Sequence, residues 1–379
     1  MRFALTSQGV KRPLGARASR PLLVPESLHR EMLKKRARRP RSQGLVGLRR
    51  HFLRAFGFAV WLAIQAGTAW PAGGYGLPPA GAHGQPAPSL PPFDAARAFS
   101  DLKHMVAFGP RPAGSPELAK TRAWIVSELN KTGLHVEEDK FAASTPVGNL
   151  DMANIIVRIP GASPEIVVVC GHYDTKRFDR FRFVGANDGA SSAALVIELT
   201  RVLAKRPLPY TLWMVLFDGE EAQREEWQGT DNDYGSRHLV QRVSAEGELN
   251  RVKALILVDM IGDAKLDIRR DPESTPWLTE LEFGTARRLG YNRYFLDQEY
   301  PVGGDDYDPW LQAGVPSVDI IDFDYGPNAR SHPGDPDWNI YWHTAEDTVE
   351  HCSPQSLEIV GRVVLGMLQE LENSPHVRP

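Results

Sequence analysis

Apolar residues beyond position 93 follow two spacings, one typical of strands and one typical of amphipathic helices. Short runs rich in β-branched residues predict strands at residues 155–159, 166–170, 212–217, 254–258 and 318–321. Apolar residues three and four positions apart predict helices at residues 95–108, 116–132, 190–204, 275–289 and 354–371. This alternation predicts a single α/β domain over residues 93–379, with a mostly parallel sheet between two layers of helices.

Charge divides the chain into two unequal parts. The first 54 residues hold 15 Lys and Arg but only two acids, whereas the remainder holds 29 basic and 45 acidic residues. An acidic body argues against nucleic acid as a partner, because phosphates are met by a basic face. The basic stretch therefore has a role separate from the fold.

The N-terminal part has the features of an export signal. Residues 49–54, RRHFLR, resemble the twin-arginine translocation motif, and the apolar run 55–66 is about as long as a signal-peptide core. Residues 67–69 then offer small side chains for cleavage. We expect a leader over 1–69, a Pro/Gly-rich linker over 70–92 and an exported protein, periplasmic or extracellular. An uncleaved anchor and a start at Met32 are the alternatives, and beyond export we expect no stable membrane partner.

The chain has two cysteines, Cys170 and Cys352. One pair does not amount to a disulfide framework, although the two could bond in an oxidising compartment.

Carboxylate and imidazole residues recur where predicted strands end. They are His172, Asp188, Glu220, Glu221, Asp259, Asp305, Asp306 and His343. Open α/β sheets bind ligands at the carboxyl ends of their strands, so these side chains are candidates for one shared site.

Zinc is bound by His nitrogen and carboxylate oxygen, and a catalytic zinc keeps one position open. Asp188, Glu221 and His343 could supply three ligands, and His172 and Asp259 could hold a second metal. Taken alone, Asp188 could be a helix cap, the two glutamates a solvated loop and His343 a structural residue. The combination favours a metal site.

Together these segments resemble the zinc exopeptidase superfamily, which implies a twisted, mixed sheet between helices. Two of its branches fit, the di-zinc aminopeptidases and the glutaminyl-peptide cyclotransferases (glutaminyl cyclases). The second fits in finer detail: residues 170–176 (CGHYDTK), 217–239 (FDGEEAQREEWQGTDNDYGSRHL), 305–311 (DDYDPWL) and 342–344 with Asp347 are similar to motifs of that family.

The resemblance implies an enzyme that converts N-terminal glutamine of peptides or proteins to pyroglutamate and releases ammonia. It also implies one zinc on Asp188, Glu221 and His343, with Glu220 transferring the proton. Asp259 and Asp305 would then form an acidic network. We expect the pocket to be lined by four aromatic residues, Trp227, Trp342, Phe323 and Tyr325.

Two other functions remain open. An aminopeptidase with two zinc ions would add His172 and Asp259 as ligands, with Asp188 as the bridge and Glu220 activating water. A non-catalytic binding domain is disfavoured, because the base and all three ligands are present. The chain departs from the cyclase pattern at Ala193, at Gly303 and in a spacer after Glu221 that is one residue longer, and these differences bear on substrate choice. Nothing in the sequence predicts an oligomeric state.

Overall fold

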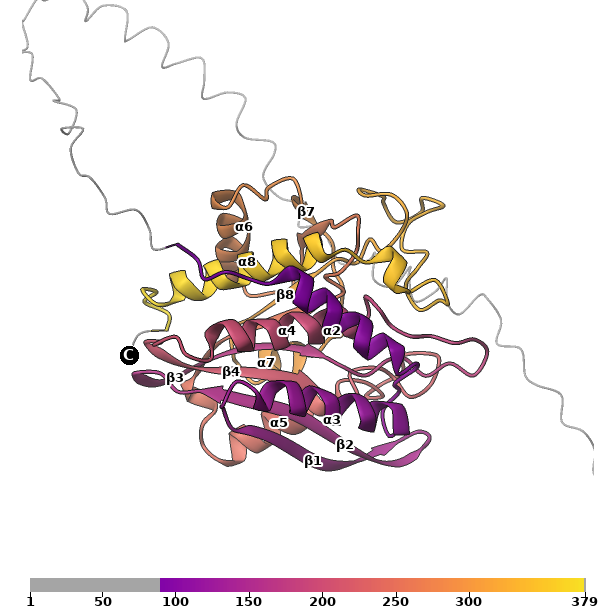
Figure 1. The fold of residues 1–379 in the computed structure, drawn as a ribbon, viewed down its shortest axis with the longest axis horizontal. Coiled ribbons are helices and arrows are strands. Elements are labelled where there is room, and N and C mark those ends of the chain that lie inside the picture. The colour runs from indigo at the N-terminus through magenta and orange to yellow at the C-terminus, as the bar shows by residue number, and fades with distance from the viewer. Residues whose placement is uncertain (1–88, 378–379) are drawn as a thin grey trace, which may run out of the picture. The chain divides into compact units, whose positions relative to one another are not determined.

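The computed structural model describes residues 89–377. The predicted leader and most of the predicted linker lie outside these residues, so the leader, the linker and the export signal stay predictions. Within the described part the chain forms one α/β domain, as predicted (Figure 1).

A mixed six-stranded sheet forms the centre of the domain. Its strands are β1 (Val136–Thr145), β2 (Gly148–Ile159), β3 (Ser163–His172), β4 (Tyr210–Phe217), β5 (Val252–Asp259) and β8 (Ser317–Ile321). They lie in the order β1-β2-β4-β3-β5-β8. The last four are mutually parallel, whereas β1 pairs antiparallel with β2 and β2 antiparallel with β4. Four carboxyl ends therefore meet at one edge of the sheet.

Both faces of the sheet are covered by helices, which explains why the sequences of its strands are continuous apolar runs. In β3, Val167 and Val169 join one buried cluster, while Val168 and Cys170 join another on the opposite face. The first cluster also takes the apolar side of α4 (Ala190–Leu203). Alternate side chains of one strand thus fill two separate cores.

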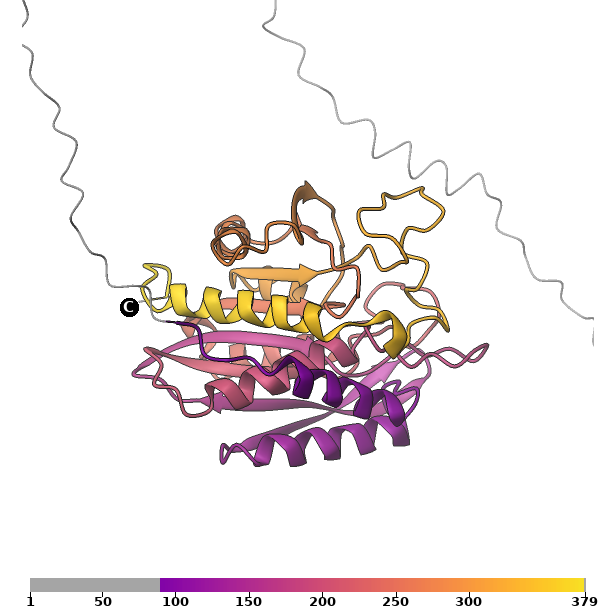
Figure 2. The same cartoon turned by 45° about the horizontal axis from the view of Figure 1, so that its top comes forward.

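Helices divide between the two faces. On the first lie α2 (Ala95–Ala107), α3 (Pro116–Asn130), α4, α6 (Pro276–Arg288) and α8 (Pro354–Leu371). On the second lie α5 (Tyr234–Ala245) and α7 (Asp308–Gln312). Figure 2 shows α8 running beside α2 along the first face. Ser115 and Ser353 begin α3 and α8 by accepting backbone N–H bonds, the usual role of serine at a helix start.

Several elements were not predicted. The β1–β2 hairpin carries many charged residues on β1, so the alternation is weak until β2 becomes apolar. The short paired strands β6 (Ile268–Arg270) and β7 (Phe295–Glu299) and helix α5 also lack a long apolar pattern.

Both cysteines are free thiols inside the protein, so the possible disulfide does not form in this structure. None of the helices in the described part combines the length and apolar character of a membrane span.

Candidate metal centre

Parallel strands deliver the candidate residues to one edge of the sheet. His172 is the last residue of β3 and Asp259 the last residue of β5. Glu220 and Glu221 follow the neighbouring strand β4 after a turn at Gly219, whose φ of 74° favours glycine. Because β3 pairs with both β4 and β5, these side chains arrive beside one another.

The first ligand group joins Asp188, Glu221 and His343. Nε2 of His343 lies 3.1 Å from Oε1 of Glu221 and 3.3 Å from Oδ2 of Asp188. Two ligand atoms on a tetrahedral zinc lie about 3.4 Å apart, since each is about 2.1 Å from the ion. Oε2 of Glu221 is buried with no hydrogen-bond partner. The donor types and their spacing therefore fit zinc.

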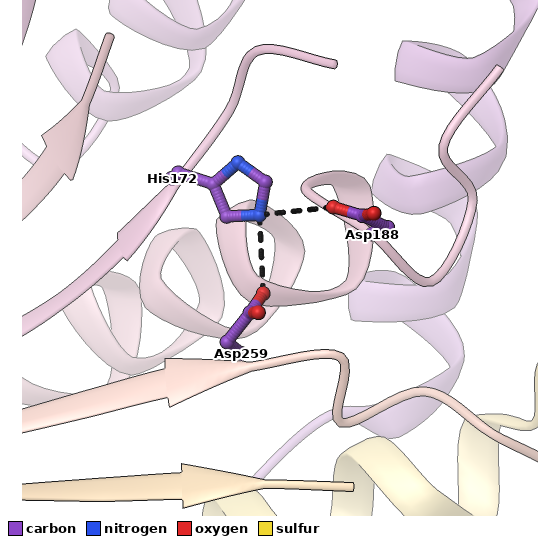
Figure 3. A group of neighbouring side chains, drawn as sticks. All are labelled: His172, Asp188 and Asp259. Atoms are coloured by element: carbon purple, nitrogen blue, oxygen red, sulfur yellow. Dashed lines mark hydrogen bonds and ion pairs between the residues drawn. The ribbon is translucent and has the colours of Figure 1, made fainter. Parts of the chain in front are cut away.

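The second group joins His172, Asp188 and Asp259 (Figure 3). Nε2 of His172 lies 3.4 Å from Oδ1 of Asp188 and 3.1 Å from Oδ1 of Asp259. Asp188 belongs to both groups and turns one oxygen toward each histidine. In the part of the chain that the structure describes, these two groups are the ones whose ligand atoms all lie within 4.8 Å of one another.

Asp174 binds the backbone of both glutamates. Its Oδ1 accepts the N–H of Glu220 at 3.2 Å and its Oδ2 accepts the N–H of Glu221 at 3.4 Å. Oδ1 also lies 3.5 Å from Nδ1 of His172. This residue stands inside the 170–176 motif, but only the structure reveals its contacts.

Lys176 is a buried cation next to the first group. Its Nζ lies 3.6 Å from Oε2 of Glu221 and 4.8 Å from the centre of the Trp227 ring. The sequence pattern alone indicates no separate role for it. The ammonium offsets part of the negative charge that Glu221 brings into the site.

Burial and mutual repulsion change the acidity of these groups. Burial raises the pKa of Glu220 well above its ordinary value, against the opposing charge of His172. Burial likewise raises the pKa of Asp305, with a further contribution from the charge of Asp259. A carboxyl group whose pKa is raised in this way is suited to proton transfer near neutral pH.

The pKa of the histidine in the first group is also raised, although burial acts on it in the opposite direction. Burial by itself would lower the pKa of His343, but the charge of Glu221 and the hydrogen bonds to Asp188 and Glu221 raise it to about 9. At Asp188, burial is outweighed by His172 and His343, which hold its pKa below the usual value. The first group therefore favours positive charge at its centre, as a bound cation provides.

A cavity of about 290 Å³ opens above the two groups. It is lined by Asp188, Glu220, Glu221, Trp227, Asp259, Met260, Val302, Gly303, Gly304, Asp305, Ile321, Phe323, Trp342 and His343. Trp342 stacks on His343, with ring centres 4.0 Å apart. Acidic groups thus form one part of this cavity, and aromatic rings form the other.

Tyr325, expected in the pocket wall, does not line this cavity. Its ring is fully buried and its hydroxyl donates to Oδ1 of Asp347 at 2.9 Å, which draws the side chain behind the wall. Asp306 is also buried away from the cavity, while Asp305 faces it.

Four further residues line the cavity that were not predicted from the sequence: Met260, Val302, Gly304 and Ile321. Met260 and Ile321 could have been predicted, because they lie at the ends of strands β5 and β8.

Comparisons with known proteins show the family of this chain. The model of peptidase family M28 matches residues 154–368. A glutaminyl-peptide cyclotransferase-like protein of Bos taurus is 30% identical over an alignment of 289 residues, which covers 69% of this chain and 72% of that protein. The glutaminyl-peptide cyclotransferase of Drosophila melanogaster is 30% identical over an alignment of 284 residues, which covers 67% of this chain and 76% of its own.

A solved structure, the glutaminyl cyclase of an Acidobacteriales bacterium, is 41% identical to this chain. It superposes with a TM-score of 0.69 and covers 77% of this chain and 99% of its own. The segment matched by the family model contains all five residues of the two ligand groups.

Proposed function

Since the chain belongs to peptidase family M28 and is 30% identical to a glutaminyl-peptide cyclotransferase-like protein over 69% of its length, we propose that it is a zinc-dependent glutaminyl cyclase. Its substrates are peptides or proteins that begin with glutamine. The products are the pyroglutamyl peptide and ammonia.

One observation supports the proposal most directly: a candidate base adjoins a group of three candidate metal ligands in a cavity that is partly lined by aromatic rings. Asp188, Glu221 and His343 meet, and the carboxyl group of Glu220 faces the same cavity. Its volume of about 290 Å³ suits a single side chain, such as that of a terminal glutamine.

Zinc held by Asp188, Glu221 and His343 would supply a Lewis acid that polarises the carbonyl of the glutamine γ-carboxamide. Glu220 accepts a proton from the α-amine as the amine nitrogen bonds to Cδ, the carbonyl carbon of the γ-carboxamide. It then passes that proton to the amide nitrogen, which leaves as ammonia when its bond to Cδ breaks. The carboxyl group of Glu220 thus handles the proton in both steps.

Other residues that line the cavity bind the substrate. Carboxyl oxygens of Asp259 and Asp305 accept hydrogen bonds from the α-amine and direct it toward the carbonyl carbon of the γ-carboxamide. Trp227, Phe323 and Trp342 enclose the side chain and exclude water, which would otherwise attack the same carbonyl.

A di-zinc aminopeptidase is the second candidate, and the grouping of His172, Asp188 and Asp259 favours it. In that reaction these residues would hold a second ion, and Glu220 would activate water. The cyclase has the stronger support, because relatives that are 30% to 41% identical to this chain are named glutaminyl-peptide cyclotransferases or glutaminyl cyclases.

Metal analysis together with an ammonia assay tests the proposal. The purified protein is expected to hold one zinc per chain and to release ammonia from a peptide that begins with glutamine. Two tightly held zinc ions and no ammonia would support the aminopeptidase instead.

A further inference from the structure

The zinc ligand Asp188 lies at the end of a short loop, residues 184–188, which we call the ligand loop. This loop precedes α4 and is folded tightly: Gly185 has a φ of 51°, and a Cβ there would lie 2.2 Å from the carbonyl oxygen of Asp188. Buried backbone groups need partners, so the loop requires both acceptors and donors from elsewhere in the chain.

Asp347 supplies the acceptors. Its Oδ1 accepts the N–H groups of Ala186 at 3.0 Å and Asn187 at 2.8 Å, and its Oδ2 accepts the N–H of Asp188 at 3.1 Å. The side chain is fully buried, and the hydroxyl of Tyr325 fixes its orientation. Three consecutive N–H groups of the loop therefore donate hydrogen bonds to one carboxylate.

Arg111 supplies the donors. Its Nη1 donates to the carbonyl of Val184 at 2.7 Å and its Nη2 to the carbonyl of Gly185 at 3.0 Å. A further bond from Nη1 to Gly109, at 3.2 Å, ties the guanidinium to its own turn. The planar guanidinium has five N–H donors in a fixed fork, so it can bond several carbonyls from one position.

Arg111 is a buried charged residue. Its side chain is fully buried, and although burial lowers its pKa to about 10, it remains charged at neutral pH. Among the residues that the structure describes, its guanidinium donates to backbone carbonyls and forms no direct ion pair. The negative charges that favour its own are those of Asp347, Asp174 and Asp188. Neither Arg111 nor Asp347 lines the cavity.

We propose that Arg111 and Asp347 are positioning residues that hold the ligand loop from its two sides and so set Asp188 for zinc. The inference rests on the zinc site of the proposed function. Partners of this kind typically change metal affinity by 10- to 100-fold when they are removed.

Zinc affinity, measured by competition with a chelator, tests the inference alongside thermal unfolding of the zinc-free protein. The variants are Asp347→Asn and Arg111→Lys. Asp347→Asn keeps the side-chain size but turns a donor toward at least one loop N–H, and Arg111→Lys keeps the charge but loses the planar fork. Each is expected to weaken zinc binding about 10- to 100-fold and to lower kcat with KM little changed.

Arg201→Met is the matched control. Arg201 is a half-buried arginine that pairs with Asp101, Glu128 and Glu198 on α4 and its neighbours, outside the site. It is expected to lower the melting temperature of the zinc-free protein and to leave zinc affinity unchanged.

Two results would overturn the inference. Wild-type zinc affinity in a folded Asp347→Asn or Arg111→Lys protein would contradict the positioning role and leave the proposed function standing. A wild-type chain that binds no zinc would remove both. Should Arg111→Lys fail to fold, the isosteric Asp347→Asn variant decides the outcome.

Discussion

Glu220 and Glu221 are adjacent in the chain, yet their carboxylates face different histidines. Oε2 of Glu220 lies 3.8 Å from Nδ1 of His172, whereas Oε1 of Glu221 lies 3.1 Å from Nε2 of His343. Both backbone N–H groups are held by one acceptor, Asp174. In the proposed function, one turn therefore presents a metal ligand and a base side by side.

This division predicts that Glu220→Gln lowers kcat without releasing zinc. The amide keeps the shape of the side chain but cannot accept the proton, and a general base typically contributes roughly 10²- to 10⁴-fold to the rate. Turnover and zinc content are measured on the same preparation.

Glu226→Gln serves as the control for Glu220→Gln, because Glu226 is exposed on the loop that follows. It is expected to retain wild-type turnover. Loss of zinc from Glu220→Gln would mean that the two adjacent glutamates have exchanged roles.

For Glu221→Gln we expect the opposite result, loss of the metal. The amide is a weaker ligand than the carboxylate, so zinc should dissociate on dialysis. Added zinc at 100 times its dissociation constant stabilises a folded protein by about 2.7 kcal/mol. Thermal unfolding with and without zinc should show this gain in the wild type and little of it in the variant; an equal gain in both would argue against Glu221 as a ligand.

Trp342 is expected to act through binding. It lines the cavity and stacks on His343, so Trp342→Leu removes part of the apolar surface that encloses the substrate side chain. A loss of about 1.4 kcal/mol of substrate binding raises KM roughly tenfold. Trp277 also stacks on a histidine, His376, but outside the cavity. Steady-state kinetics should show a raised KM for Trp342→Leu and none for Trp277→Leu; equal effects would place the role of Trp342 in folding.

Both cysteines should resist chemical modification in the folded protein. Cys170 and Cys352 are buried and unpaired, and burial raises the pKa of each thiol well above its ordinary value. Since the thiolate is the reactive form, alkylation should require unfolding. Mass spectrometry should find two alkylated thiols after denaturation without reductant, whereas a disulfide would leave none.

The sequence predicted most of the central fold because apolar strands buried on both faces give long, unambiguous runs. Helix α8 was predicted with its observed bounds, and α4 differs by one residue at its end. Helix α5 was missed, because only one side of it packs on the sheet and its sequence is largely polar.

At the site, residue type indicated the ligands but not how they are held. His343 lies in a loop with a φ of 54°, a conformation that no local pattern predicts. The contacts of Asp174, Asp347 and Arg111 join segments far apart in the chain, so they depend on the completed fold. The same dependence explains Tyr325, whose hydroxyl is drawn to Asp347 instead of the cavity.

The most direct test is to follow the masses of two peptides that differ only in their first residue, glutamine or leucine, after incubation with the zinc-loaded protein. The account predicts that the glutamine peptide loses one ammonia and keeps its length, while the leucine peptide is unchanged. Removal of the first residue from either peptide, without cyclisation of the glutamine peptide, would contradict it.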